Sequence, residues 1–425
     1  MKTVESTVRL GLCCSCGVCK GVCPRNCIDF VRKDGMFLPA IEETACVNCG
    51  LCASVCPGLG HTYAPKATAE ETVTGEVLAC FNAWSRDGAL RHVSASGGVI
   101  STLIQHLLAG GRYDGAFCLD SYDYRQQLKT RLYTPEEVAA SWARSSAPKS
   151  RYLPVSHENA VRYMLKNREK RLILVGTSCG IRSLQAAVEA RKLNREQYLF
   201  VGLFCDKVFN YNVLSYFEDA YGGGAKLKSL HFKNKESGGW PGDMKFFPED
   251  GAPFYVPMSA RTGAKAYFMP ERCLYCVDKL NVCADISLGD NYTGKDESPL
   301  GSNSVIIRTG AGWTAWQAAA DGLEIRPIGI ADIQEAQAIG MRLQNLYFGD
   351  LASEKWEKPM DLNPGVPRAQ TAASCSNACR VSLKRLRTGA VYHRNPTAVG
   401  WQIRRDNRKP NLLIRGLRKL RRLMR

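Results

Sequence analysis

Two cysteine-rich runs near the start of the chain have the residue types and the spacing that bind iron–sulfur clusters. Each run reads CxxCxxCxxxCP, first over residues 13–24 and again over 46–57. A four-iron cubane needs four converging thiolates. The tight CxxCxxC loop supplies three, and the fourth cysteine of each doubled run serves the other cluster. We therefore expect two 4Fe-4S clusters, one held by Cys13, Cys16, Cys19 and Cys56 and the other by Cys46, Cys49, Cys52 and Cys23.

The segment that joins the two runs predicts the strands beneath such clusters. Residues 27–41, CIDFVRKDGMFLPAI, alternate in polarity around Asp34-Gly35, a pair typical of tight hairpin turns. Zinc or chance are the alternatives, but zinc needs neither the doubled run nor the prolines that follow it. Cys14 and Cys27 are left over, and we expect small buried side chains there. Residues 1–62 are thus predicted to form a ferredoxin-type domain.

Composition favours a globular protein of a reducing compartment. The 425 residues are 45% hydrophobic, which suits two or three domains. No run of about 18 uncharged apolar residues occurs, and residues 1–10 lack a secretory core. We therefore expect a cytoplasmic protein in which the spacing of the 19 cysteines indicates metal binding and not disulfides.

The net charge of +17 is concentrated in the tail. Residues 380–425 hold 15 Lys and Arg against one acid, Asp406, so the tail carries +14 and residues 1–379 only +3. A nearly neutral body argues against nucleic acid as a partner. Apolar residues recur at helical spacing within a basic background at Leu413, Leu417, Leu420 and Met424. Such a helix suits an anionic membrane surface at its cytoplasmic face, and a solvated or partner-bound helix is the alternative.

The rest of the chain is predicted to alternate between helices and strands. The pattern of residues 97–111 predicts a helix, whereas the apolar runs 171–176 and 198–205 predict strands. This alternation indicates α/β layers, and with the ferredoxin-like domain the whole chain is predicted to be α+β. We expect a linker over 63–76, an α/β domain over 77–360 and a basic C-terminal tail with an amphipathic helix over 361–425.

Four segments of this body resemble one known family. They read SASGGVISTLIQHLL, GTSCGIRSLQ, LFCDKVFN and CLYCVDKLNVCADISLGD, in that order within residues 94–290. Together they resemble the beta subunit of coenzyme F420 hydrogenase and its relatives, which include chlorophyll reductases and bacterial proteins associated with polysaccharide biosynthesis. The resemblance implies FAD, one or more 4Fe-4S clusters and a site where the flavin exchanges hydride with a substrate.

The same resemblance implies a third cluster. Four cysteines match family cysteines, two at strand ends and two in a CxxC loop: Cys179, Cys205, Cys273 and Cys276. Cys283 is a rival ligand, and isolated cysteines such as Cys179 and Cys205 are otherwise often apolar core. Cys80 and Cys118 match nothing and are expected in the core.

The flavin contacts are implied by analogy and by local chemistry. Small residues before a helix let a ligand approach free backbone N–H groups, although an ordinary capped helix is the alternative. Residues 148–155 resemble a family segment written SKY, with Arg151 in place of lysine; Asp290 and the loop 301–304 resemble further family positions, with a solvated turn as the alternative. The expected contacts are Ser94, Ser96, Gly97, Gly98, Lys149, Ser150, Arg151, Tyr152, Thr177, Ser178 and Asp290, where Thr177 and Ser178 precede a helix expected to begin near Ile181.

These features predict a flavin-dependent iron–sulfur oxidoreductase. Clusters pass single electrons and organic substrates take hydride, so a flavin is needed to connect them. The alternative is a non-catalytic electron-transfer subunit that relays electrons to ferredoxin or to another oxidoreductase subunit. The substrate, the direction of electron flow and the proton donor stay open, with His92 and His231 as candidates for the donor.

Overall fold

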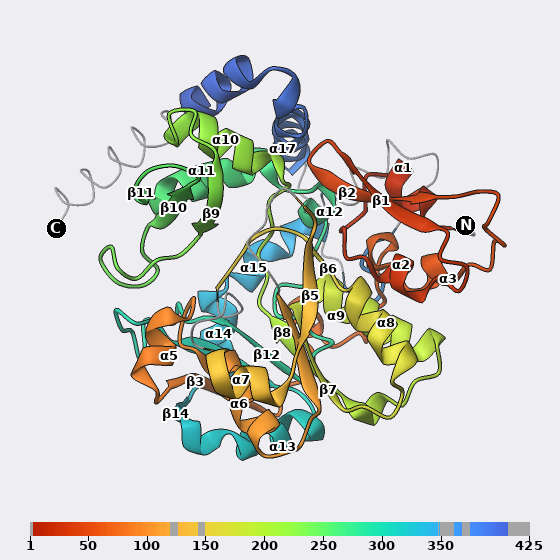
Figure 1. The fold of residues 1–425 in the computed structure, drawn as a ribbon, viewed down its shortest axis with the longest axis vertical. Helices are drawn as coiled ribbons and strands as arrows, with labels where there is room; N and C mark the ends of the chain where they lie inside the picture. Colours follow the sequence, from red (N-terminus) through yellow and green to blue (C-terminus); the bar gives the residue numbers. More distant parts are fainter. Residues whose placement is uncertain are drawn as a thin grey trace.

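A nine-stranded mixed sheet forms the centre of the chain (Figure 1). Its strand order is β14-β3-β13-β12-β8-β7-β4-β5-β6. The pairs β12–β8, β8–β7, β7–β4 and β5–β6 are parallel, and the other pairs are antiparallel. The computed structural model describes residues 3–119, 126–142, 149–346, 348, 361–367 and 375–406. The strands of the sheet are β3 (Ala79–Ser85), β4 (Gly115–Leu119), β5 (Leu128–Tyr133), β6 (Val155–Ser156), β7 (Leu172–Thr177), β8 (Tyr198–Leu203), β12 (Ile286–Asp290), β13 (Asn303–Ile307) and β14 (Leu323–Pro327).

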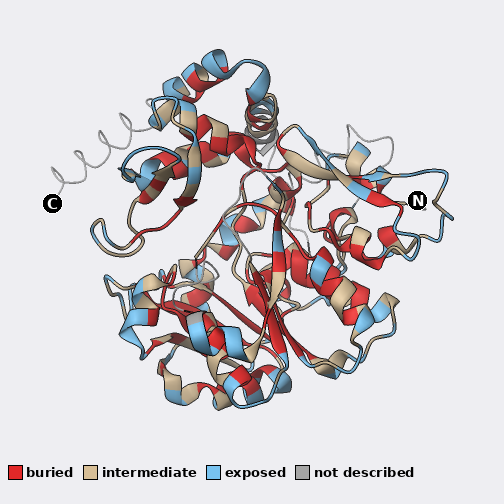
Figure 2. Cartoon of the chain, viewed as in Figure 1, coloured by how far each residue is buried: buried red, intermediate tan, exposed pale blue. Residues whose placement is uncertain are grey.

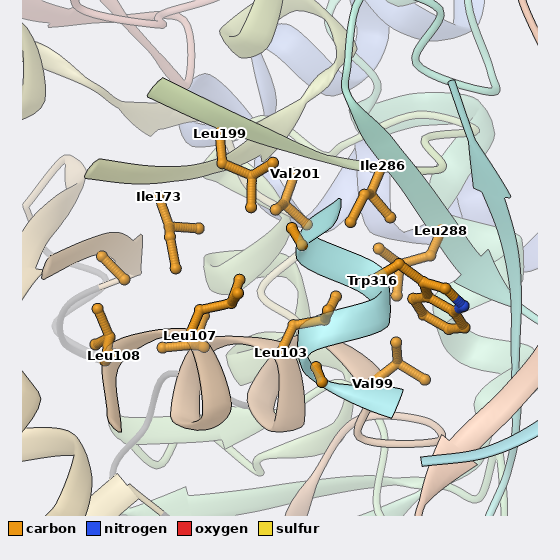
Figure 3. Close-up of a cluster of buried hydrophobic side chains, with 14 of the residues drawn as sticks. Val99, Leu103, Leu107, Leu108, Ile173, Leu199, Val201, Ile286, Leu288 and Trp316 are labelled. Carbon is orange, nitrogen blue, oxygen red and sulfur yellow. The ribbon is translucent and has the colours of Figure 1, made fainter. Parts of the chain in front are cut away.

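Both faces of the central strands are buried, which explains their continuous apolar runs. Successive side chains of a strand point to opposite faces. Ile173 and Leu199 face the helices α6 (Val99–Ala109) and α13 (Gly310–Ala318), as Figure 3 shows. Leu174 and Phe200, one residue further along each strand, face the opposite core. The expected α/β character of the body is therefore confirmed.

Helices cover the two faces of the sheet. The expected helix over 97–111 and the strands over 171–176 and 198–205 are confirmed by α6, β7 and β8. The helix expected near Ile181 begins three residues earlier, at Ser178, directly where β7 ends. The remaining helices of the body are α4 (Ala69–Thr74), α5 (Gly88–Val93), α7 (Pro135–Ser141), α8 (Glu158–Lys166), α9 (Ser178–Ala190), α12 (Glu271–Leu274), α14 (Ile330–Ala336) and α15 (Ile339–Arg342).

A second lobe has its own core of aromatic side chains, among them Phe209, Phe217 and Phe232. Figure 2 shows buried residues concentrated both in this lobe and in the large sheet. The lobe contains the antiparallel sheet β11-β10-β9 and three longer helices. Its elements are α10 (Asn212–Tyr221), β9 (Leu227–His231), β10 (Met244–Pro248), β11 (Phe254–Val256), α11 (Met258–Phe268) and α17 (Cys375–Ala390).

The N-terminal residues form a small module that packs on α8 and α9 (Figure 1). Its hairpin pairs Lys33 with Met36 across Asp34-Gly35, as the sequence predicts. Gly21 permits the packing, since a Cβ there would lie 2.8 Å from Cβ of Val161 on α8. The module consists of α1 (Glu5–Arg9), α2 (Val18–Val22), β1 (Ile28–Lys33), β2 (Met36–Ile41), α3 (Leu51–Ser54) and a 3-10 turn (Pro57–Leu59).

Two stretches pack more closely than the sequence predicts. The expected linker 63–76 contains α4, and it buries Tyr63 and Val73. The expected tail is not peripheral over its described part, because Tyr392 and Ile403 belong to the core of the second lobe. Apolar residues are sparse in this segment, so its composition does not predict that it packs into a core. Residues 413–424 lie outside the described residues. None of the helices in the described ranges has the length and apolar character that a membrane crossing requires.

Two glycines of α13 provide a matched test of this packing. A Cβ at Gly312 would lie 2.3 Å from the backbone oxygen of Asp285, whereas a Cβ at Gly310 would have no neighbour within 4 Å. We expect Gly312→Ala to lower stability by about 1–3 kcal/mol through overpacking. Gly310→Ala should change it by less than about 1 kcal/mol. Thermal unfolding of the full chain checks this, and equal melting temperatures for the two variants would contradict the described contact.

Candidate functional site

The first four predicted ligands lie together where the module meets the body. Burial, together with the neighbouring thiol of Cys56, raises the pKa of Cys16 to about 12. The pKa of Cys19 is raised by burial and then by Cys16, Cys13 and Cys56. These thiols therefore face one another from α2, the loop before it and the end of α3. The Cys56 Sγ also lies 3.4 Å from the hydroxyl of Thr7.

The second four predicted ligands line one cavity on the outer side of the module. Cys23, Cys46, Cys49 and Cys52 all contribute to its wall, together with Cys27. The Cys49 side chain is exposed, whereas Cys52 is buried. Cys27, expected to be a small buried residue, lies with its Sγ 3.5 Å from that of Cys23. The donor set is four thiols around an apolar hollow, which fits a cubane cluster.

The thiols of each set lie too far apart to bind one metal ion together. Within the described ranges, no three His, Cys, Asp or Glu side chains form a group that could hold a single metal ion. A thiolate set for a cubane is wider, because each sulfur binds a different iron at a corner of the cluster. Besides burial, the pKa values of Cys16 and Cys19 are raised by Cys56, and that of Cys52 is raised by Cys49 and Cys23.

The third predicted set gathers at the carboxyl ends of two parallel strands. Cys179 follows β7 and Cys205 follows β8, while Cys273 and Cys276 lie at α12 and just after it. Burial raises the pKa of Cys205, and Cys273, Cys179 and Cys276 raise it further, so the four thiols are neighbours. The rival ligand Cys283 has a different partner: its Sγ lies 3.8 Å from Nε2 of His61.

Cys14 connects the first set to the third. A hydrogen bond to Cys179 is the largest influence on both thiols, and it lowers the pKa of Cys179 and raises that of Cys14. Besides burial, the thiol of Cys179 also raises the pKa values of Cys13 and Cys16 in the first set. The sequence predicts only a small buried side chain at Cys14, because the contact partner is 165 positions away along the chain.

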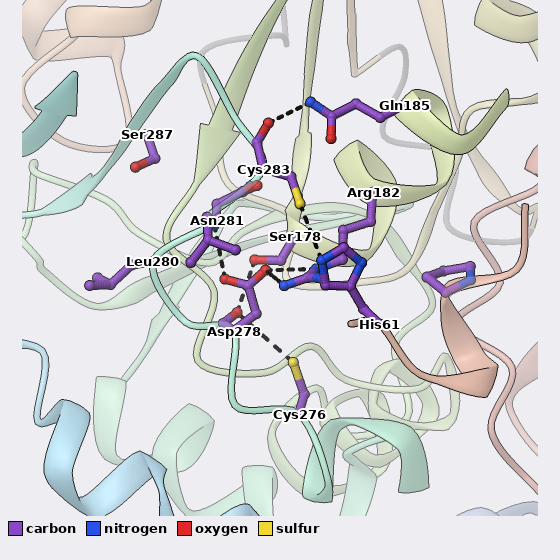
Figure 4. Close-up of polar contacts among 12 residues, drawn as sticks. His61, Ser178, Arg182, Gln185, Cys276, Asp278, Leu280, Asn281, Cys283 and Ser287 are labelled. Atoms are coloured by element: carbon purple, nitrogen blue, oxygen red, sulfur yellow. Dashed lines mark hydrogen bonds and ion pairs between the residues drawn. The ribbon is translucent and has the colours of Figure 1, made fainter. Parts of the chain in front are cut away.

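A buried polar network anchors the loop that follows Cys276 (Figure 4). Arg182 donates two hydrogen bonds to one carboxylate oxygen of Asp278, at 2.8 and 2.6 Å, and both side chains are buried. The hydroxyl of Ser178 donates to the Asp278 carbonyl, and Asn281 donates to carbonyls of β7 and β8. Breaking a buried ion pair costs about 3–5 kcal/mol, so this loop is held firmly.

A second cluster of polar groups surrounds the end of β12. Asp290 lies two residues beyond Leu288, which pairs with Leu203 of β8, so Asp290 and Cys205 leave neighbouring parallel strands at the same edge. Lys233 forms a buried ion pair with Asp290, and the Tyr292 hydroxyl donates to the same carboxylate at 3.2 Å. Trp240 lies against Tyr292, with ring centroids 5.4 Å apart.

Several expected flavin contacts lie in this second cluster. The hydroxyl of Ser96 donates to the carbonyl of Ser302 in the loop 301–304, and Lys235 donates to the carbonyl of Ser96. Burial, together with the positive charges of Lys149 and Arg91, lowers the pKa of Lys235 to about 7. We call the following residues the basic cluster: Arg91, Lys149, Arg151, Lys233, Lys235 and Arg261.

Other expected contacts are placed differently. Thr177 and Ser178 lie with the third cysteine set, since the Thr177 hydroxyl is 3.5 Å from the Cys179 Sγ. Ser94 donates to the carbonyl of Leu90 inside its own helix, so its side chain is already paired. Tyr152 packs on Phe232 below Arg261. Gly97, Gly98 and Ser150 fall in the segments that border the basic cluster.

The two candidate proton donors also separate. His92 is exposed on α5. His231 ends β9, and burial lowers its pKa to about 4, with Lys149 and Arg151 as further causes. An imidazole with this pKa is neutral at neutral pH, so His231 is not an imidazolium there.

Sequence reasoning missed three groups of the site. Lys233, Lys235 and Trp240 follow β9 in a stretch with no recognisable motif, and only the fold brings them to Asp290. The Nε1 atom of Trp240 is buried and has no hydrogen-bond partner within the described part of the chain. Cations beside an aromatic pair suit a ligand that joins an anionic group to a flat ring, and the flavin dinucleotide FAD has both features.

Comparisons with known proteins identify the family that this chain resembles. Two family descriptions match, both for the beta subunit of coenzyme F420 hydrogenase/dehydrogenase: its N-terminal part matches residues 80–162 and its C-terminal part matches residues 169–330. The coenzyme F420 hydrogenase subunit beta of Methanosarcina barkeri is 28% identical over 270 residues, covering 61% of this chain and 85% of that protein. An uncharacterized protein of Nostoc sp. is 26% identical over 237 residues, covering 54% of each.

A solved structure has a similar fold. A chain of the F420-reducing NiFe hydrogenase complex from Methanosarcina barkeri superposes with a TM-score of 0.51 at 22% identity. The match covers 68% of this chain and 97% of that chain.

The ion pair of Asp290 with Lys233 gives a prediction for stability. Asp290→Asn leaves Lys233 buried without a counter-charge, so we expect a loss of about 3–5 kcal/mol. The control Asp29→Asn removes a surface pair with Lys20, in which Asp29 is 85% exposed, and should cost less than about 1 kcal/mol. Thermal unfolding of both variants measures the difference. A smaller loss for Asp290→Asn than for Asp29→Asn would show that the pair is not buried in solution.

Proposed function

Since the chain belongs to the coenzyme F420 hydrogenase/dehydrogenase beta subunit family, we propose that it is an iron–sulfur flavoprotein oxidoreductase. In this proposal, electrons pass between three 4Fe-4S clusters and FAD, and the flavin exchanges hydride with a small-molecule substrate or a deazaflavin coenzyme. The observation that carries the proposal is the contact series of the cysteine sets. Besides burial, the thiol of Cys52 in the second set raises the pKa of Cys19 in the first set. The thiol of Cys179 in the third set likewise raises the pKa of Cys13 in the first set.

This series supports a continuous path for single electrons. The first set lies between the other two, so no cluster would have to exchange electrons across the body of the protein. The Ser183 hydroxyl donates to the carbonyl of Val55, and the backbone N–H of His157 donates to the carbonyl of Cys16. These bonds fix the module to α8 and α9, which keeps the distances between the sets constant.

The basic cluster supports the flavin half of the proposal. FAD would supply the step between single-electron and hydride chemistry. Lys235 and Lys149 would bind its pyrophosphate, because charge-assisted hydrogen bonds to phosphate are strong. Trp240 and Tyr292 would lie against a ring system, and Asp290 would keep Lys233 in place. The carboxyl ends of parallel strands, where Asp290 and Cys205 lie, are the usual binding edge of an α/β sheet.

The comparison with a hydrogenase complex favours a second candidate. The solved relative is part of a multi-subunit assembly, so this chain is also a candidate electron-transfer subunit whose partner is another oxidoreductase subunit. The two candidates differ in one measurement. A complete enzyme oxidises or reduces a small molecule by itself, whereas a relay subunit exchanges electrons only with its partner. The names of the relatives do not mention polysaccharides, and that association is not part of the proposal.

The iron content tests the third cluster. We expect about twelve irons per chain after anaerobic purification, and about eight after Cys273→Ser, because one cubane of four irons would be lost. The matched control is Cys118→Ser, which changes a buried cysteine of the sheet core that belongs to none of the three sets. Iron and sulfide assays measure the content. Twelve irons in the Cys273→Ser variant would exclude this ligand set.

The pH dependence of flavin binding tests the basic cluster. Lys235 has a pKa of about 7, lowered by burial and by Lys149 and Arg91, so its cationic fraction falls as the pH rises from 6 to 8. The cation attracts the pyrophosphate, so FAD should bind more weakly at pH 8, by about tenfold if the bond contributes about 1.5–3 kcal/mol.

Lys235→Met should therefore bind FAD weakly at both pH values and lose most of this pH dependence. Lys295→Met is the control, because Lys295 is 57% exposed and pairs with Asp332 at the surface. Fluorescence titration of the flavin-depleted protein measures the affinity. An unchanged pH profile in Lys235→Met would remove Lys235 from the flavin site.

A further inference from the structure

Two buried arginines flank the third cysteine set from different elements. Arg272 precedes Cys273 in α12, and Arg342 ends α15. Each residue is only 8% exposed. The sequence resemblance assigns no role to either residue. Burial of a guanidinium is expensive, because several kcal/mol of hydration must be replaced by partners within the protein.

The partners of these arginines in the described part of the chain are few. The Nη2 atom of Arg272 lies 3.5 Å from the carbonyl of Pro57, at the limit of a hydrogen bond, and its Nε and Nη1 atoms have no partner. Arg342 donates from Nη1 to Asp206 at 3.3 Å, and its Nε atom has no partner. Asp206 is shared with Lys265 and Lys207, so it does not neutralise Arg342 alone.

The groups that face the two guanidinium groups are thiols. The neighbouring charges that most raise the pKa of Arg272 are those of Cys276 and Cys14. Those that most raise the pKa of Arg342 are the charges of Cys276, Asp206 and Cys205. The two cations thus approach the same four-cysteine set, Arg272 from the module side and Arg342 from the side of Asp206. The thiols of Cys273 and Cys276 affect the pKa of both guanidinium groups.

The first cysteine set has different surroundings. The charged groups that most affect Cys13, Cys16 and Cys19 are other cysteines. A cluster bound there would have negatively charged neighbours, whereas a cluster bound by the third set would lie between two cations. With four thiolates a 4Fe-4S cluster carries about −2 when oxidised and gains one more negative charge on reduction, so nearby cations favour the reduced form.

We propose that Arg272 and Arg342 are positioning residues that raise the reduction potential of the third cluster above the potentials of the two ferredoxin-type clusters. This inference rests on the proposed function, because it requires all three clusters. One electron then leaves a reduced cluster of the module and reduces the oxidised third cluster, so the donor loses the charge that the acceptor gains. The arrangement directs electrons inward, from a one-electron donor at the module toward the flavin.

The test is a redox titration of the full-length protein followed by electron paramagnetic resonance. The signal of the third cluster is identified as the one that Cys273→Ser removes. In the wild type we expect this signal to appear at a higher potential than the signals of the module. In Arg272→Gln, and separately in Arg342→Gln, the ratio of reduced to oxidised third cluster at fixed potential should fall about tenfold, which equals about 59 mV for a one-electron couple.

Two controls separate charge from structure. Arg272→Lys keeps the positive charge, so its ratio of reduced to oxidised third cluster should be close to that of the wild type. Arg195→Gln changes an arginine that pairs with Asp285 at a distance from the cysteine sets, and it should leave all midpoints unchanged. The signals of the module serve as an internal reference in every sample.

Three results would overturn the inference. One is a third cluster with a lower midpoint than the module clusters in the wild type. Another is an unchanged midpoint in both glutamine variants at full iron content. The third is loss of the cluster from both glutamine variants and from Arg272→Lys, which would assign the arginines to cluster assembly. A wild type without a third signal contradicts the proposed function itself, and is thereby distinguished from these results.

Discussion

The contact between the N-terminal module and the carboxyl ends of β7 and β8 is the constraint on which the candidate site depends. Electron transfer between clusters needs short, constant distances, and in the proposed function these would be set by the packing of α2 on α8 and α9. Gly21 allows the helices to approach, and the bonds of Cys16 and Val55 to the body fix the orientation. A side chain in place of Gly21 would move the whole module and with it two of the three cysteine sets.

Charge compensation is the second condition of the fold. Twelve thiols in three sets would place a large negative charge in the protein once iron is bound. Positive charges near the thiols are distributed unevenly. Arg272 and Arg342 lie near the third set, whereas the first set has mainly other thiols around it. Arg182, by contrast, is already paired with Asp278 and acts as a structural anchor. Arg182 thus holds a loop in place, whereas the charges nearest to Arg272 and Arg342 include thiols of the third set.

The sheet explains why two kinds of chemistry lie close together. Parallel strands bring their carboxyl ends to one edge, and β7, β8 and β12 end there with Cys179, Cys205 and Asp290 close by. The second lobe supplies the lysines that surround Asp290, because β9 ends near this edge. One edge of one sheet thus borders both the third cysteine set and the basic cluster.

The sequence by itself determined the local features of this protein. The doubled cysteine runs, the hairpin at Asp34-Gly35 and the apolar strands β7 and β8 are short-range patterns, and each depends only on neighbouring residues. The contact of Cys283 with His61, the contact of Cys14 with Cys179 and the pairing of Lys233 with Asp290 were decided by the tertiary structure. Thr177 and Ser178 illustrate the difference, since Thr177 lies beside the sulfur of Cys179 only two residues along the chain, whereas packing brings Ser178 to the carbonyl of Asp278. Side chains that meet across long stretches of sequence leave no periodic signal in the chain, because their proximity is produced by the folding of the intervening strands and helices.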